Sequence, residues 1–123
     1  MSQGRRLLGR RGESAAEAVL LARGYRILAR NYRCPLGELD LVASEGGAVV
    51  FVEVKTRRGA RAGSGAEAIS GRKRWRLMLL ARYYLAAHGL EGRPCRFDVV
   101  SLSVAPGRAR VRVWRDAFQG EGG

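Results

Sequence analysis

Charged residues interrupt an apolar stretch of the sequence, Gly37 to Arg57, and their types and spacing could support chemistry. Glu38 and Asp40 stand in one apolar run, and Glu53 and Lys55 stand two positions apart in the next. A charged side chain persists in such surroundings only when it is paired, solvated or bound to a metal. Two carboxylates without His or Cys form an oxygen-ligand site of the kind that Mg²⁺ or Mn²⁺ prefers. With a lysine beside it, such a site suits metal-assisted hydrolysis of a phosphodiester.

The two apolar runs predict the strands of a hairpin, residues 37–44 and 48–57, joined by a short Gly-containing loop. Side chains alternate between the two faces of a strand, so Glu53 and Lys55 share a face, and hairpin pairing brings Asp40 near Glu53. The cluster therefore lies at the end of a sheet strand, where α/β proteins favour ligand sites. The alternative is a solvated salt bridge between Glu53 and Lys55 on an exposed sheet face.

The elements around this hairpin predict an α/β fold with the order helix, three strands, helix, two strands. Apolar residues recur at helical spacing over residues 7–23, and a capping-box match at Ser14 would start this helix late. A second capping-box match at Ser64 precedes helical spacing that continues to Gly89. This long crossover helix favours a mixed sheet with helices on its faces. Further strands are predicted at residues 25–33, 96–103 and 108–115.

Length and composition suit one domain, since the chain has 123 residues and is 46% apolar. We assign residues 1–118 to this single domain and expect residues 119–123 to be a disordered tail. Acidic residues near the N-terminus interrupt any apolar signal region, and no stretch reaches the roughly 20 apolar residues of a membrane span. We therefore expect a cytoplasmic protein with no membrane partner. Cys34 and Cys95 are expected to be reduced thiols rather than a disulfide, and their spacing excludes most zinc-site patterns.

The charge balance points to a polyanionic partner. Lys and Arg number 23 against 11 acidic residues, which gives a net charge of +12 and a pI near 11.3. Such basicity in a small domain is most often found in proteins that bind nucleic acid, and we expect the partner of this protein to be DNA. Only Lys55 and Lys73 are lysines, which suggests a chemical role for the compact ammonium group at these positions. A protein that binds RNA or an anionic membrane without chemistry would carry the same charge.

Several basic residues are candidates for contact with phosphates, because neutralisation of the backbone dominates affinity for nucleic acid. For those in the second predicted helix, the alternative is an ordinary solvated helix face. The candidates are Arg57 and Arg58 after the charged strand, and Arg72, Lys73, Arg74 and Arg76 in the helix.

Beyond these arguments, the chain resembles known families. Asp40, followed by Glu53-Val54-Lys55 on the next strand, resembles the PD-(D/E)xK signature of the restriction-endonuclease-like superfamily, with Leu39 in place of the signature's Pro. A wider set of segments resembles the YraN-type family of predicted bacterial nucleases, related to archaeal Holliday-junction resolvases. These segments are Gly12-Glu13, Asn31-Tyr32-Arg33, Gly37-Glu38-Leu39-Asp40, Phe51-Val52-Glu53-Val54-Lys55, Arg96-Phe97-Asp98-Val99-Val100 and Ala117-Phe118.

The resemblance implies a restriction-endonuclease-like mixed sheet and a set of catalytic residues. Asp40, Glu53 and the carbonyl of Val54 would be ligands of Mg²⁺ or Mn²⁺, and Lys55 would be the catalytic lysine. Glu13 matches the additional acid that resolvase relatives bring to the metal; without the resemblance it would be read as an exposed helical residue.

Glu38 has two readings. It would either support the metal ligands from behind or form a salt bridge with a neighbouring arginine.

The sequence therefore predicts a Mg²⁺-dependent endonuclease acting on DNA, with branched or otherwise structured DNA among the candidate substrates. The alternative is a nuclease-like fold that binds DNA or RNA without cutting it. The intact set of Asp40, Glu53 and Lys55 favours the enzyme. Symmetric cutting of two strands needs two active sites, so we expect a homodimer. The apolar last strand, with Val111 and Val113, would form part of its interface or cover the protomer's own core.

Overall fold

Strands rich in apolar residues form one mixed sheet. The computed structural model describes residues 14–58 and 69–118 of the chain. The order of elements is helix, three strands, helix, two strands, which confirms the predicted α/β order. Residues 14–22 are helical and are called the N-terminal helix below. The other elements are β1 (Arg26–Cys34), β2 (Gly37–Glu45), β3 (Ala48–Arg58), α2 (Gly71–Ala87), β4 (Cys95–Ala105) and β5 (Arg108–Phe118).

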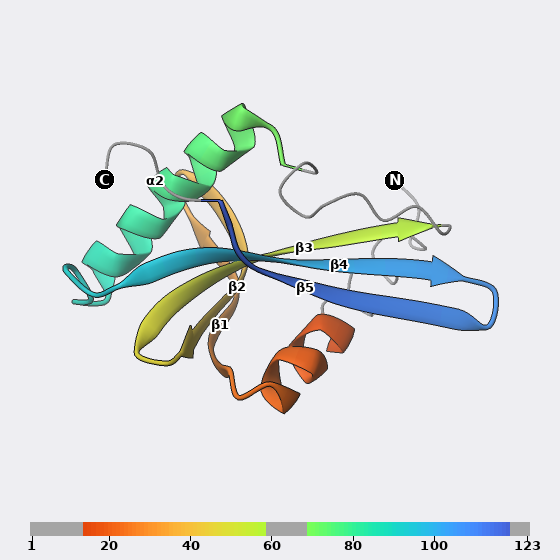
Figure 1. Cartoon of the computed structure of the whole chain (residues 1–123). Coiled ribbons are helices and arrows are strands. Elements are labelled where there is room, and N and C mark those ends of the chain that lie inside the picture. The colour runs from red at the N-terminus through yellow and green to blue at the C-terminus, as the bar shows by residue number, and fades with distance from the viewer. Residues whose placement is uncertain (1–13, 59–68, 119–123) are drawn as a thin grey trace.

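The five strands lie in the order β1-β2-β3-β4-β5. All neighbours are antiparallel except β3 and β4, which run parallel and are therefore joined by a crossover that includes α2. Figure 1 shows α2 on one face of the twisted sheet and the N-terminal helix on the other. Among the described residues, neither helix has the length and apolar content that crossing a membrane requires.

A tight turn fixes the hairpin that carries the charged residues. Glu45 pairs with Ala48, so the turn consists of Gly46 and Gly47, with φ values of +59° and +86°. Two successive residues with positive φ match the twist of the flanking strands, and glycine adopts them without steric cost. The register that follows pairs Leu41 with Val52.

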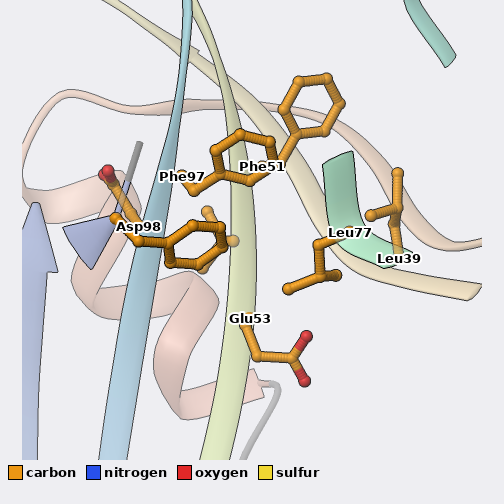
Figure 2. Close-up of a pocket in the computed structure, with 8 residues that line it drawn as sticks. Leu39, Phe51, Glu53, Leu77, Phe97 and Asp98 are labelled. Atoms are coloured by element: carbon orange, nitrogen blue, oxygen red, sulfur yellow. The ribbon is translucent and has the colours of Figure 1, made fainter. Parts of the chain in front are cut away.

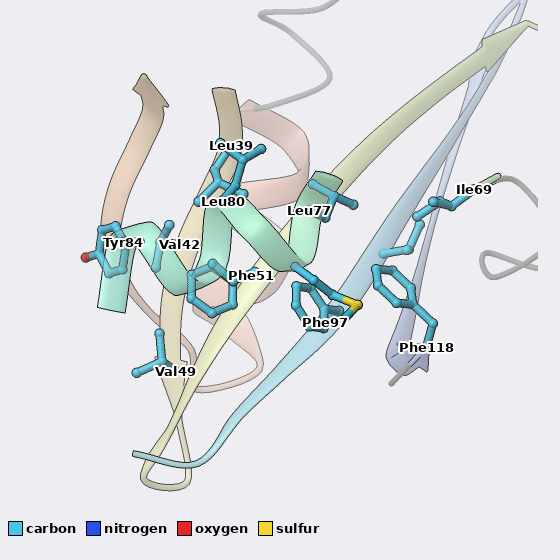
Figure 3. Close-up of a cluster of buried hydrophobic side chains, with 13 residues drawn as sticks. Leu39, Val42, Val49, Phe51, Ile69, Leu77, Leu80, Tyr84, Phe97 and Phe118 are labelled. Carbon is cyan, nitrogen blue, oxygen red and sulfur yellow. The ribbon is translucent and has the colours of Figure 1, made fainter. Parts of the chain in front are cut away.

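Two apolar clusters hold the helices on the sheet. Beneath α2, Leu77, Leu80 and Tyr84 pack on Phe51 and Phe97 of the central strands (Figure 3). On the opposite face, Ala16 and Leu20 of the N-terminal helix pack among Leu41, Val50, Val52 and Val100. Burying one such Leu or Phe side chain contributes about 1.5–3 kcal/mol. The central strands are thus buried on both faces, and charged side chains there need specific partners.

The start of α2 differs from the prediction. The helix begins at Gly71, and the Ser70 hydroxyl caps it by accepting a hydrogen bond from the Lys73 N–H at 3.2 Å. Ile69, immediately before the cap, is buried in the core. The predicted capping box at Ser64 lies outside the described residues. The observed cap places Lys73 in the first turn of α2.

The last strand runs further than predicted, to Phe118. Val111 and Val113 pack in the cluster beneath the N-terminal helix, so they cover the protomer's own core. Cys34 and Cys95 are free thiols, as predicted. The expected tail, residues 119–123, lies outside the described residues.

Candidate functional site

The side chains of Glu53 and Lys55 project from β3 on the α2 side of the sheet, after the apolar part of the strand. Phe51 belongs to the cluster beneath α2 and Val52 to the opposite one, so alternation assigns Glu53 to the α2 side. Figure 2 shows the Glu53 carboxylate on the same side of β3 as Leu77 of α2. Glu53 and Lys55 therefore share a face, as the sequence predicted.

Asp40 is tied directly to β3. Its Oδ2 accepts a hydrogen bond from the backbone N–H of Val54 at 2.8 Å, which places it beside the Glu53–Lys55 segment. Strict alternation in β2 would separate Leu39 from Val42, yet both pack beneath α2. The alternation therefore breaks at Asp40. Its position depends on the contact with Val54 rather than on regular strand geometry.

Lys73, in the first turn of α2, is a further member of this charged group. Its Nζ lies 2.9 Å from Glu53 Oε1, and the exposed fractions of the two side chains are 40% and 10%. The sequence predicted Lys73 as a phosphate contact and missed this ion pair, although the scarcity of lysine singled it out. The two lysines of the chain, Lys55 and Lys73, thus meet at one acidic site, which we call the Glu53 cluster: Asp40, Glu53, Lys55 and Lys73.

The two lysines differ in how firmly they hold their protons. Burial lowers the pKa of Lys55, and the adjacent Lys73 ammonium lowers it further. Burial is the largest single effect on Lys73 and opposes its charge, but the hydrogen bonds to Glu53 and Lys55 and the negative charges of Glu53 and Asp40 together raise the pKa of Lys73. Lys73 is therefore the more permanent cation of the pair, and Lys55 is the one that releases a proton more easily.

The residues present fit a hard divalent cation. Asp40 and Glu53 supply carboxylate oxygens, and Mg²⁺ binds proteins through one or two carboxylates while keeping waters or substrate phosphates as its other ligands. The ion pair between the Lys73 ammonium group and Glu53 shows that the site already attracts a cation. Within residues 14–58 and 69–118, no group of three or more His, Cys, Asp or Glu side chains gathers, and the third expected acid, Glu13, lies outside these ranges.

The other candidates occupy varied positions. Glu38 lies 3.6 Å from Arg33 across the β1–β2 pair, and both side chains are substantially exposed, which matches the salt-bridge reading. Arg74 donates to the Ile69 carbonyl at 3.2 Å and lies over the Phe118 ring. Arg72 and Arg76 are exposed on α2. Arg57 and Arg58 end β3, and their side chains lie outside the described part of the structure.

A second charged group lies on the opposite face of the sheet, and none of its residues was predicted from the sequence to be catalytic. Asp98, which is 1% exposed, accepts hydrogen bonds from the Tyr25 hydroxyl at 2.7 Å and from Arg96 Nε at 3.0 Å. The backbone N–H of Asp116 adds a third at 2.9 Å. Arg96 also contacts Glu45. We call Asp98, Tyr25, Arg96 and Glu45 the Asp98 cluster.

The fold and the site together define a mixed α/β domain with two carboxylates and two lysines at the end of a central strand. Residues 12–102 match the family described as "Uncharacterised protein family UPF0102", and the chain belongs to this family. It is 56% identical over 102 residues to a UPF0102 protein of Moorella thermoacetica, covering 83% of this chain and 85% of that protein. It is 54% identical over 114 residues to a UPF0102 protein of Symbiobacterium thermophilum, covering 92% and 97%.

A solved structure also resembles this fold in part. It is "The structure of Pyrococcus Furiosus SfsA in complex with Ca2+", with a TM-score of 0.39 and 18% sequence identity. The likeness covers 90% of this chain and 63% of that chain.

Proposed function

We propose that this protein is a Mg²⁺-dependent endonuclease that hydrolyses phosphodiester bonds in DNA. The observation that carries the proposal is the Glu53 cluster, in which two carboxylates and two lysines gather on a chain of net charge +12. A protein that only bound nucleic acid would gain nothing from carboxylates beside a phosphate, since like charges repel. The same residues carry the resemblance to the PD-(D/E)xK superfamily. The proposal therefore includes the placement of the UPF0102 family in this superfamily.

Each residue has a role in the proposed reaction. Asp40 and Glu53, with the Val54 carbonyl, would hold the metal, and Mn²⁺ would also fit this set of oxygen ligands. Bound there, the ion supplies a Lewis acid that polarises a phosphate oxygen. The Val54 N–H fixes the Asp40 carboxylate in place. Lys55 stabilises negative charge on the phosphate or orients the attacking water.

Lys73 neutralises Glu53 before substrate arrives. With two carboxylates and two ammonium groups, the cluster has no net formal charge, and a bound divalent cation makes it positive. DNA therefore approaches a site that does not repel it. We propose branched or otherwise structured DNA as a substrate class to be tested beside linear DNA.

One observation favours a second candidate function. Glu53 already has a cationic partner in Lys73, as a purely structural ion pair would. On that reading, the protein binds DNA or RNA on a nuclease-like fold without cutting it. Metal-dependent cleavage separates the two functions.

The test is a cleavage assay with purified protein and Mg²⁺ or Mn²⁺ against linear, flapped, single-stranded and four-way DNA. Asp40→Asn and Glu53→Gln are each expected to lower the cleavage rate at least about 100-fold, equivalent to about 2.7 kcal/mol of transition-state stabilisation. DNA binding should survive or tighten in both, because a negative charge is removed. Glu38→Gln is the matched control and should cut like the wild type.

Two outcomes would contradict the proposal. Equal cleavage by the wild type, Asp40→Asn and Glu53→Gln would assign the activity to another site or to a contaminant. Binding without cleavage on every substrate would favour the non-catalytic function.

We also propose that the active form is a homodimer, because symmetric cutting of two strands requires two active sites and the chain supplies one. Light scattering of the protein, free and bound to a four-way junction, tests this. A monomer in both states would leave only single-strand nicking.

A further inference from the structure

The sheet continues beyond the Glu53 cluster as a three-stranded arm. In Figure 1 the C-terminal ends of β3 and β4 and the start of β5 extend side by side past α2. The register aligns Lys55 with Ser101 of β4, and Ser101 with Arg112 of β5. One row further out, Ser103 pairs with Arg110. Strand spacing of about 4.8 Å places Arg112 about 10 Å across the sheet from Lys55.

Arg110 and Arg112 project from the same face as the Glu53 cluster. Their neighbours Val111 and Val113 pack beneath the N-terminal helix, so alternation directs the two arginines to the α2 side. Both are exposed, and neither makes an ion pair with any described residue. This differs from Arg30, Arg33, Arg96 and Arg115, each of which is paired with a glutamate or an aspartate.

Arg112 is held in place by an aromatic ring. Its guanidinium carbon lies 4.6 Å from the centre of the Trp114 ring, within the range of a cation–π contact. Trp114 is in turn fixed, since its Nε1–H donates to the Ser101 hydroxyl at 3.3 Å. A guanidinium ordered in this way loses less conformational entropy when it binds a ligand.

We propose that the α2-side face of this arm, centred on Arg110 and Arg112, binds the phosphate backbone of DNA that extends from the Glu53 cluster. The direction of the DNA rests on the proposed function, whereas the binding surface itself does not. In the sequence, the valines of this strand indicated an apolar face, and no role was assigned to the arginines that alternate with them.

Charge and spacing both suit this occupant. The segments 55–58, 101–105 and 108–113 that form the arm contain no Asp or Glu. Arginines two positions apart on a strand stand about 6.7 Å apart, which lets each meet a different phosphate of one backbone. Ser101 and Ser103, between the arginines and β3, add hydroxyl groups of a kind that often contacts phosphates.

The test compares two double variants that remove the same charge. Arg110→Gln/Arg112→Gln removes the proposed surface. Arg26→Gln/Arg93→Gln is the control, because these two exposed arginines line a hollow of about 550 Å³ at the opposite end of the sheet. Affinity for a fluorescent DNA, as duplex and as single strand, is measured by anisotropy across a salt series in EDTA.

The Arg110/Arg112 variant should bind about tenfold more weakly at low salt, and its plot of log affinity against log salt for duplex DNA should be shallower by about 2. The control should bind within about twofold of the wild type, and both variants should keep the wild-type circular dichroism spectrum and melting temperature. An unchanged affinity of the Arg110/Arg112 variant, or an equal loss in the control, would overturn the proposal.

Cleavage separates this proposal from the proposed function. A wild type that never cuts, with binding that still depends on Arg110 and Arg112, would leave the surface standing without the nuclease. A wild type that cuts, with binding indifferent to these arginines, would do the reverse.

Discussion

The two charged clusters lie on opposite faces of the same sheet and are built in opposite ways. In the Asp98 cluster, the Asp98 side chain is fully buried, and Arg96, at 16% exposed, contacts both of its oxygens. In the Glu53 cluster, the partner of Glu53 is a lysine that is 40% exposed. Figure 2 shows Asp98 and Glu53 pointing to opposite sides of the neighbouring strands β4 and β3.

The difference separates a structural role for the Asp98 cluster from the role proposed for the Glu53 cluster. The Asp98 carboxylate is satisfied by a tyrosine, an arginine and a backbone N–H, which leaves no position for a ligand. The Glu53 carboxylate is neutralised by a long side chain that is itself 40% exposed to solvent. Both acids interrupt apolar strands in the sequence, so the exposure of the partner distinguishes the two roles.

The largest effect is expected from Asp98→Asn. It removes the buried negative charge that faces Arg96 and leaves this arginine with Glu45 as its acidic partner, and breaking a buried ion pair costs about 3–5 kcal/mol of unfolding free energy. Equilibrium unfolding in urea measures the loss. A change below about 1 kcal/mol would erase the distinction between the clusters.

Tyr25→Phe should have the next largest effect. The Tyr25 hydroxyl donates to Asp98 and accepts from Arg96, so its loss leaves buried polar groups with one partner fewer. We expect a decrease of about 1–2 kcal/mol in unfolding free energy. Tyr83→Phe, at an exposed site on α2, is the control and should stay within about 0.5 kcal/mol. Equal effects in the two variants would contradict the structural role of the Asp98 cluster.

Lys73→Met sharpens the description of the Glu53 cluster. Without the ammonium group, a divalent cation no longer competes with Lys73 for Glu53. A partly exposed ion pair contributes about 1 kcal/mol, which corresponds to a fivefold change in the affinity for the metal. The Mn²⁺ concentration that gives half of the maximal rise in melting temperature should therefore fall about fivefold. Arg72→Met, one position earlier and exposed, should leave it unchanged. A higher Mn²⁺ requirement in Lys73→Met would show that Lys73 assists the metal instead.

The smallest effect on stability is expected from Glu53→Gln. Lys73 is exposed enough to be hydrated once its partner is neutral, so unfolding free energy should change by less than about 1 kcal/mol. Urea unfolding of this variant beside Asp98→Asn gives the comparison directly. A loss as large as that of Asp98→Asn would make Glu53 a structural residue.

Much of the fold was predictable because its signals are local. Alternating apolar residues located the strands, and Gly46-Gly47 located the hairpin turn. The start of α2 was not predictable in this way, because Ser64 and Ser70 are both acceptable caps by residue type. The observed cap follows Ile69, whose side chain is anchored in the core, and that anchor is set by tertiary packing.

The candidate site divides along the same line. Glu53 and Lys55 share a face by the period of one strand, so the sequence was sufficient to place them together. The contact of Lys73 with Glu53 depends on how α2 crosses the sheet, and no local pattern carries that information. Asp40 lies between these cases, since pairing brought it near Glu53 but its hydrogen bond to Val54 accompanies a break in the alternation of β2.

The parallel pairing of β3 and β4 has a consequence for folding kinetics. The two strands are neighbours in the sheet, but residues 59–94 separate them, so a long loop must close before they pair. β1, β2 and β3 are joined by short turns and are expected to pair earlier. The carboxylates of Asp40 and Glu53 then meet before α2 delivers Lys73. Glu53→Gln should therefore refold faster than the wild type in stopped-flow measurements, and an unchanged refolding rate would show that α2 docks before β1, β2 and β3 pair.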